Sequence, residues 1–270
     1  MSLSDCGILY VATRADYVEE ANESAVSFRQ QNPEIPLAIA TDCPEVADKN
    51  LFAYILPLTN PSGNFFDKIH GMLLSPFTRT AFIDTDAYAA DSITDLFRVL
   101  EKFDLAVAYD PIRSDFVQDD IPDSFPTPNT GVIAYQNTPA VRDFFNEWLA
   151  AYQWQMTLPV KPGHDQPAFR RALYLSKLRF TILPDEWNLR VIFPHLIGGN
   201  AQVKIIHGRH EHRTHALRYA GTKTYLPRVV SRDFSIMALL EMLVHRVQLQ
   251  LGKFIGSNGK SGRRGVKGKN

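Results

Sequence analysis

The sequence contains little of what would mark a secreted, membrane-spanning or nucleic-acid-binding protein. It has only two cysteines, Cys6 and Cys43, in 270 residues, which favours a reducing compartment. No segment approaches the ~18–20 uninterrupted apolar residues that a bilayer-spanning helix needs, and the first residues lack the basic region and apolar run of a signal peptide. Basic and acidic residues are equal in number, at 29 each, which argues against a nucleic-acid partner. We therefore expect a cytoplasmic protein that is soluble or peripheral on a membrane.

Charge is nevertheless distributed unevenly along the chain. The last twenty residues carry six basic side chains and no acid, whereas residues 1–250 carry 23 basic and 29 acidic ones. Residues 257–270 are mostly Gly, Ser, Asn, Lys and Arg, a composition that cannot build a core and predicts disorder. Before them, apolar residues line one side of a predicted helix over 235–256. This stripe is interpreted first as packing against a main domain over 1–234, and alternatively as contact with an anionic membrane surface.

Short apolar runs alternate with amphipathic stretches over the first 200 residues. The runs predict strands at 7–13, 36–41, 51–57, 80–84, 105–109 and 131–135, with 180–183 and 203–206 closing the sheet. The amphipathic stretches predict helices at 17–31, 65–74, 92–103, 140–152 and 165–176. This strand–helix–strand order predicts a single α/β domain whose central sheet is mostly parallel and flanked by helices.

Two carboxylates directly follow one of the predicted strands, in the stretch Asp84-Thr85-Asp86. Ligands of open α/β sheets bind at the carboxyl ends of strands. A pair of carboxylates there can chelate a hard divalent cation, which in turn binds the phosphates of a nucleotide. A solvated turn is the alternative, because the tripeptide alone is a weak signal.

Several other polar residues allow two interpretations each. Lys68 fits a solvated helix position, Asn129-Thr130-Gly131 fits a turn into a strand, and Asp165 before Gln166 fits a helix cap. Each also fits a binding site. The Pro- and Asp-rich loop over 110–129 is too long for a neutral connector.

Histidines are concentrated in one short segment. Four of the eight, His207, His210, His212 and His215, fall within nine residues. His207 ends an apolar strand and is interpreted as a metal ligand, whereas the other three are interpreted first as a polar surface loop.

Seven short segments, taken together and in order, resemble the retaining family-eight glycosyltransferases, the glycogenin and lipopolysaccharide galactosyltransferase family. They begin at Thr13, Phe66, Phe82, Ile93, Asn129, Asp165 and Lys204, and the resemblance covers roughly residues 7–210. Their joint order is far less expected by chance than any one of them.

The resemblance implies the nucleotide-diphosphosugar transferase (GT-A) fold and transfer of a hexose from a UDP-sugar to an acceptor hydroxyl with retention. The acceptor is a saccharide, lipid or protein that the sequence does not identify. By resemblance, Asp84, Asp86 and His207 hold Mn²⁺ (or Mg²⁺). Catalytic roles fall to Asp165, Gln166 and Lys68, and donor binding falls to Thr13, Tyr17, Lys68, Thr85, Asn129, Thr130 and Gly131.

The chain departs from this family after His207. The family follows its histidine and glycine with Lys-Pro-Trp, and here the phosphate-binding lysine is absent, so Arg209 or Arg213 is expected to replace it. Two other classes stay open. One is an inactive nucleotide- or carbohydrate-binding module of the same fold. The other is a haloacid-dehalogenase phosphatase, which also uses an Asp-x-Asp after a strand.

Overall fold

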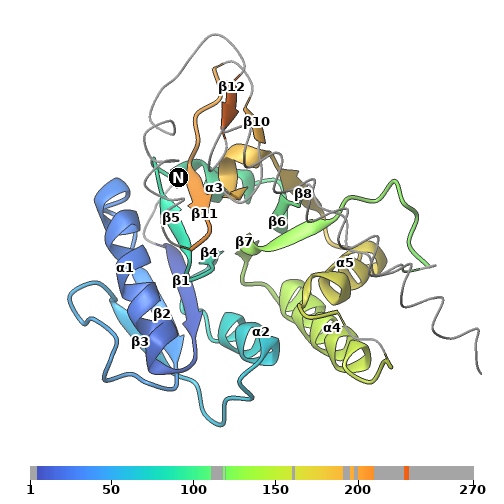
Figure 1. Cartoon of the computed structure of the whole chain (residues 1–270), viewed down its shortest axis with the longest axis horizontal. Coiled ribbons are helices and arrows are strands. Elements are labelled where there is room, and N and C mark those ends of the chain that lie inside the picture. Colours follow the sequence, from blue (N-terminus) through green and yellow to red (C-terminus); the bar gives the residue numbers. More distant parts are fainter. Residues whose placement is uncertain are drawn as a thin grey trace, which may run out of the picture.

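A seven-stranded sheet forms the centre of the computed structural model, which describes residues 5–110, 118, 120–159, 162–190, 195–197, 200–209 and 228–230 (Figure 1). Its order is β3-β2-β1-β4-β7-β6-β8. The strands are β1 (Cys6–Ala12), β2 (Leu37–Thr41), β3 (Tyr54–Pro57), β4 (Arg79–Ile83), β6 (Leu105–Tyr109), β7 (Pro128–Gln136) and β8 (Phe180–Leu183). β7 runs antiparallel to both of its neighbours, and the other pairings in this sheet are parallel. The predicted mostly parallel sheet is confirmed.

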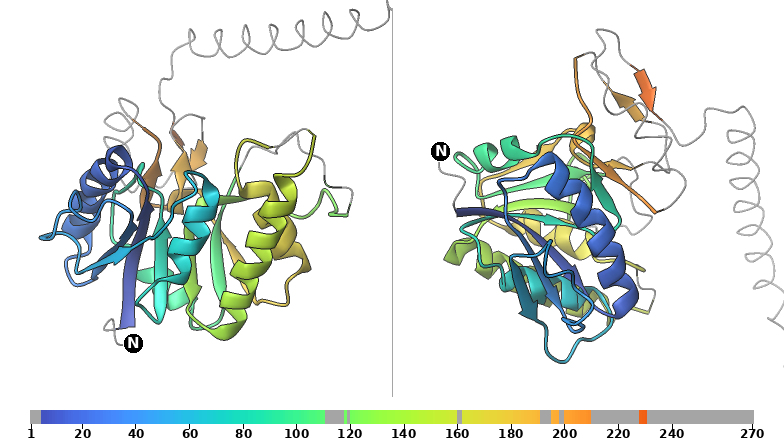
Figure 2. Two further views of the ribbon diagram at one scale, coloured as in Figure 1. Left: turned by 90° about the horizontal axis from the view of Figure 1, so that it is seen from below. Right: turned by 90° about the vertical axis from the view of Figure 1, so that its left-hand side faces the viewer.

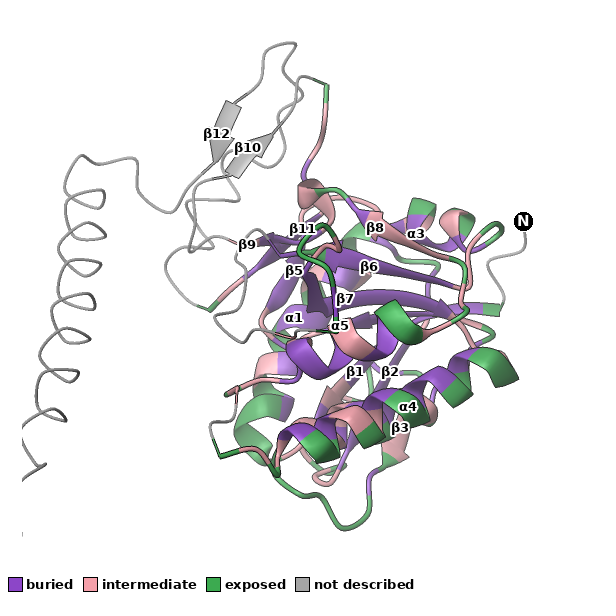
Figure 3. Ribbon diagram, turned by 90° about the vertical axis from the view of Figure 1, so that its right-hand side faces the viewer, coloured by how far each residue is buried: buried purple, intermediate pink, exposed green. Residues whose placement is uncertain are grey.

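Helices cover both faces of this sheet (Figures 2 and 3). One face packs against α1 (Ala15–Gln31) and α3 (Thr94–Val99), and the other against α2 (Phe65–Leu73), α4 (Pro139–Gln155) and α5 (Gln166–Leu175). Successive side chains of a strand point to opposite faces of the sheet, which produces these two cores. Val132 of β7, for example, belongs to the first core and Ile133 to the second. No helix among the described residues has the length and apolar character needed to cross a bilayer.

Helix α2 lies unusually close to the end of β1, and this places its first turn at the edge of the sheet. Gly71 permits the approach, because a Cβ at this position would lie 2.5 Å from the Cγ atoms of Val11. The helix begins after Asn64, whose side chain accepts a hydrogen bond from Phe66 N at 2.9 Å. Asp67 turns back to accept hydrogen bonds from the Gly63 and Ser62 backbone N–H groups. The Asn64 cap and the Asp67 hydrogen bonds together fix the start of the helix.

A second, three-stranded sheet corrects the prediction that 203–206 closes the main sheet. Strand β11 (Ile205–His207) lies between β5 (Ala87–Ala89) and β9 (Leu189–Arg190), and β8 is the edge of the main sheet. The prediction failed because β5 is only three residues long, too short for its pattern to be recognised. Strands β10 (His195–Ile197) and β12 (Arg228–Val230) pair separately.

One further local prediction needs correction. The helix expected over 92–103 is limited to α3, and Ile93 takes its N-cap position without a side-chain cap. Asp91, two residues before Ile93, forms an ion pair with Lys204. The predictions for His210, His212, His215, Arg213, residues 111–117 and the segment 231–270 lie outside the described residues.

Candidate functional site

Four neighbouring strands place polar residues at one edge of the main sheet. β1, β4 and β6 end immediately before Thr13, Asp84 and Asp110. β7 runs in the opposite direction, so its beginning, Asn129 to Gly131, lies at this same edge beside the ends of β4 and β6. The candidate site is therefore built where ligands of open α/β sheets generally bind.

Asp84, Asp86 and His207 converge at this edge. One ligand atom from each residue lies within 4.8 Å of the others. His207 Nε2 is 3.2 Å from Asp86 Oδ1 and 3.9 Å from Asp84 Oδ2. The three residues predicted as metal ligands are thus brought together, although 120 residues separate the aspartates from the histidine in the sequence.

The small sheet explains how His207 reaches the aspartates. β11 pairs with β5 so that His207 faces Ala87, the residue directly after Asp86. Gly208 N donates to Asp86 O at 2.9 Å and continues this pairing. On the other side, Asn188 Oδ1 lies 2.8 Å from His207 Nδ1. His207 Nε2 is consequently the nitrogen that faces the two carboxylates.

The chemistry of this donor set fits a divalent cation. Burial would raise the pKa of Asp86, but the hydrogen bond and charge of His207 and the charge of Arg209 outweigh it and lower the pKa to about 2. Asp86 is therefore a carboxylate at neutral pH. Two carboxylates and one imidazole nitrogen suit Mn²⁺ or Mg²⁺ by ligand type.

Lys68 lies between the candidate metal ligand Asp84 and a second acidic residue, Asp165. Its Nζ lies 2.9 Å from Asp84 Oδ1 and 3.8 Å from Asp165 Oδ2, and it donates to Thr130 O at 3.3 Å. Burial would lower the pKa of the Lys68 ammonium, but the charges of Asp165 and Asp84 outweigh it and raise the pKa. The interpretation of Lys68 as a solvated helix residue is wrong, because its side chain is only 11% exposed.

The side chain of Asp165 does not cap helix α5 but hydrogen-bonds to Thr130. It occupies the N-cap position of α5 but its side chain makes no capping hydrogen bond, so the capping interpretation is wrong. Its Oδ1 accepts a hydrogen bond from Thr130 Oγ1 at 3.1 Å, and burial raises the pKa of the carboxyl. Its Oδ2 is buried without a hydrogen-bond donor among the described residues. This oxygen faces Lys68 Nζ at 3.8 Å, and Asp165 does not line the pocket described below.

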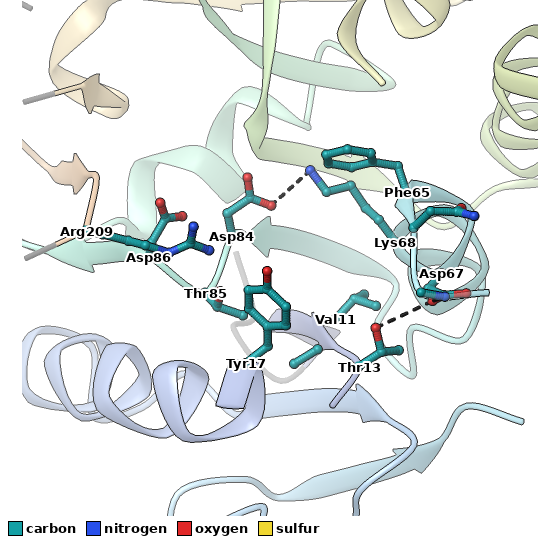
Figure 4. Close-up of a pocket in the computed structure, with 13 residues that line it drawn as sticks. Val11, Thr13, Tyr17, Phe65, Asp67, Lys68, Asp84, Thr85, Asp86 and Arg209 are labelled. Carbon is teal, nitrogen blue, oxygen red and sulfur yellow. Dashed lines mark hydrogen bonds and ion pairs between the residues drawn. The ribbon is translucent and has the colours of Figure 1, made fainter. Parts of the chain in front are cut away.

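A pocket of about 350 Å³ opens beside these residues. Its lining includes Thr13, Tyr17, Thr85 and Arg209 as well as Lys68 and the two aspartates. Figure 4 shows Tyr17 rising from α1 into the pocket, while Lys68 and Asp84 point toward each other. Five predicted site residues do not line the pocket as described: Asn129, Thr130, Gly131, Asp165 and Gln166. Gln166 and Asn129 both hydrogen-bond to Asp110 Oδ2, at 2.8 and 3.1 Å.

Arg209 enters this pocket from the segment that follows His207. Its guanidinium pairs with Glu20 and lies 5.5 Å from the centroid of the Tyr17 ring. Thr85 Oγ1 also hydrogen-bonds to Glu20. Of the two arginines expected to replace the missing lysine, Arg209 lies in the pocket and Arg213 lies outside the described residues.

Sequence reasoning missed Asp110, Asn188 and Glu20 as members of the site. Asp110 carried a usable signal, since it follows an apolar strand in the same way that Asp84 does. Asn188 follows the short η2 helix (Asp185–Trp187) and carried no such signal. Glu20 lies within α1, where an acidic residue on a helix surface is unremarkable.

Replacing Gly131 by alanine should displace His207. The added Cβ would lie 2.3 Å from His207 Cε1 and 2.8 Å from its Nδ1. We expect Mn²⁺ affinity to fall by about 10–100-fold, as when a residue supporting a metal ligand is lost. Titration followed by electron paramagnetic resonance measures this. Gly163→Ala is the matched control, because nothing lies within 4 Å of a Cβ there, and unchanged affinity in Gly131→Ala would refute the expectation.

Comparison with known proteins identifies the fold. No protein-family model and no curated protein sequence matches the chain. Among solved structures, the galactosyltransferase LgtC in complex with donor and acceptor sugar analogues is 15% identical, with a TM-score of 0.53 over 68% of this chain and 75% of that one. The glycosyltransferase GlyE of Streptococcus pneumoniae is 16% identical, with a TM-score of 0.50 over 68% of this chain and 46% of that one. The chain therefore has the GT-A glycosyltransferase fold, as predicted.

Proposed function

We propose that the chain is a metal-dependent glycosyltransferase that moves a hexose from a UDP-sugar to an acceptor hydroxyl. The observation that carries the proposal is the meeting of Asp84, Asp86 and His207 beside the buried Lys68–Asp165 pair. The GT-A fold and the 350 Å³ pocket at the same edge support it. Membership of the retaining family, and retention of the anomeric configuration, are parts of the proposal that rest on the resemblance of the motifs.

Asp84, Asp86 and His207 would hold the metal. Carboxylates suit both Mn²⁺ and Mg²⁺, and an imidazole ligand favours the transition metal, so we propose Mn²⁺. When bound, the ion supplies positive charge that stabilises the leaving diphosphate. Arg209, next to Asp86 in the pocket, would contribute further positive charge toward the same group once it leaves Glu20.

The donor's base and sugar would contact opposite parts of the site. Tyr17 and Thr13 would bind the flat pyrimidine at the end of β1, with Tyr17 stacking on the ring. Asp165 Oδ2, which has no hydrogen-bond donor among the described residues and does not line the pocket, would accept a hydrogen bond from a sugar hydroxyl once donor binding opens the site beside Lys68. Lys68 would orient both Asp84 and Asp165. Gln166 remains a proposed catalytic residue, and the remaining proposed contacts of the donor are Thr85, Asn129, Thr130 and Gly131.

A phosphatase of the haloacid-dehalogenase type is a weaker candidate. Such an enzyme carries its aspartate pair on an early strand, whereas Asp84 and Asp86 follow β4. It also has no need of His207, which faces both carboxylates here.

Calorimetry of nucleotide binding tests the proposal without an acceptor. UDP should bind more tightly with Mn²⁺ than with a chelator, and more tightly than ADP. Equal affinities for UDP and ADP would remove the claim of uracil specificity. Affinities that do not change with Mn²⁺ would remove the metal from the proposal.

Tyr17→Ala should weaken UDP binding by about tenfold or more, since stacking of a base on an aromatic ring contributes about 1–3 kcal/mol. The same calorimetric titration measures it. Tyr174→Ala is the matched control, because Tyr174 is 39% exposed and Tyr17 is 37% exposed, but only Tyr17 lines the pocket. An equal, small effect of both substitutions would show that the base does not stack on Tyr17.

A further inference from the structure

Three buried polar side chains connect the end of β6 to the metal-ligand histidine. Asn129 Nδ2 donates to Asp110 Oδ2 at 3.1 Å, and Asn188 Nδ2 donates to Asn129 Oδ1 at 3.0 Å. Asn188 Oδ1 then lies 2.8 Å from His207 Nδ1. Asp110, Asn129 and Asn188 are each at most 3% exposed. We call these three residues the amide relay.

The direction of the amide relay is fixed at its far end. A carboxylate can only accept a hydrogen bond, so Asp110 requires the NH₂ group of Asn129 to face it. The Gly131 backbone N–H can only donate, and at 2.9 Å it requires the oxygen of Asn129 on the other side. The Asn129 oxygen is therefore also the acceptor that faces Asn188, and Asn188 donates to it through its NH₂ group. In this orientation the oxygen of Asn188 faces His207.

This direction determines what His207 can do. An oxygen beside Nδ1 requires a proton on Nδ1, and the nitrogen left to bind a cation is Nε2, which faces Asp84 and Asp86. Partners of this kind fix the ring orientation of metal-binding histidines and raise their basicity. Resting on the proposed function, we infer that Asn188 is a positioning residue for the metal site and that Asp110 and Asn129 set its orientation.

Asp110 also orients residues outside the amide relay. Its Oδ2 also accepts from Gln166 Nε2 at 2.8 Å and lies 3.1 Å from Arg190 Nη1. One buried carboxylate thus orients the residue at the start of α5 and, through two amides, the metal-binding histidine. Asn129 Nδ2 carries a second hydrogen, so its role in the relay does not exclude contact with the donor.

Substitutions at Asn188 test the inference through Mn²⁺ affinity, measured by electron paramagnetic resonance on the full chain without nucleotide. Asn188→Ala removes the acceptor and should weaken Mn²⁺ binding by about 10–100-fold. Asn188→Asp keeps an oxygen toward Nδ1 but loses the NH₂ group that donates to Asn129, so it should weaken Mn²⁺ binding clearly less than Asn188→Ala does. Asn137→Ala is the control, because Asn137 also makes several hydrogen bonds but lies beyond the opposite end of β7.

Proton NMR of the protein saturated with diamagnetic Mg²⁺ gives a second readout. A protected imidazole N–H resonance that disappears in His207→Gln is assigned to Nδ1–H. It should persist in Asn188→Asp and Asn137→Ala and be lost by solvent exchange in Asn188→Ala.

The outcomes separate the inference from the proposed function. Unchanged Mn²⁺ affinity in Asn188→Ala, or an equal loss in Asn188→Asp, would overturn the positioning role. Absence of Mn²⁺ binding in the unmodified protein would overturn the metal site and the relay's role with it. If the unmodified protein binds Mn²⁺ and the variants behave as expected, but no UDP-sugar turns over, the inference stands and the proposed function fails.

Discussion

Asp86→Asn should reduce Mn²⁺-dependent turnover of a UDP-sugar by about 100-fold or more. A bound metal contributes several kcal/mol of charge stabilisation to a leaving phosphate, and each ~1.4 kcal/mol is a factor of ten in rate. The substitution keeps the shape of the side chain but removes the charge 3.2 Å from His207 Nε2. Release of UDP, followed by a coupled assay, measures the rate.

Asp95→Asn is the matched control for Asp86→Asn. Asp95 lies on α3, is 62% exposed and forms an ion pair with the neighbouring Arg98. It should retain full turnover, and both variants should keep the circular dichroism of the unmodified chain. A folded Asp86→Asn protein with normal turnover would contradict the assignment of Asp86 as a metal ligand.

Lys68→Met should reduce turnover by about 100-fold and also destabilise the fold. Removal of one partner from a buried ion pair costs about 3–5 kcal/mol, because it leaves the other charge uncompensated. Lys68 is 11% exposed and Asp165 is 2% exposed, so solvent does not replace the lost partner. For a chain of this size the loss corresponds to a fall in Tm of about 6–20 °C, which differential scanning calorimetry measures.

A double variant separates the two effects of Lys68→Met. Adding Asp165→Asn removes the more deeply buried of the two carboxylates that lose their lysine and leaves only the partly exposed Asp84, so part of the lost stability should return while turnover stays low. Lys102→Met, at an exposed position beyond α3, is the control for loss of a lysine charge. Turnover that recovers together with stability in the double variant would show that the pair acts on folding alone.

Most of the main sheet could be predicted from the sequence because its inner strands are buried on both faces. The residues of β2 and β6 read as continuous apolar runs, and their observed bounds agree closely with those expected. The small sheet could not be predicted in this way. β5 and β9 have three and two residues, too few for any period to appear, and they form because β11 offers them a partner.

The candidate site divides in a similar way. Asp84 and Asp86 were found because a carboxylate pair after an apolar strand is visible in a single segment, and His207 because it ends another strand. Asn188 was missed because its role depends on contacts with Asn129 and His207, which lie 59 and 19 residues away. Hydrogen-bond partners that are distant in the sequence leave no local pattern.

Hydrolysis of UDP-hexoses tests the central claim most directly, because slow hydrolysis needs no acceptor. The unmodified chain is incubated with a panel of UDP-hexoses and Mn²⁺, with Mn²⁺ and excess chelator, and with Mn²⁺ restored. The account predicts release of UDP from at least one donor, its loss with chelator, its recovery when Mn²⁺ is restored, and its near absence in Asp86→Asn. Release at the same rate with chelator, or no release from any UDP-hexose by a chain that binds Mn²⁺ and UDP, would contradict it.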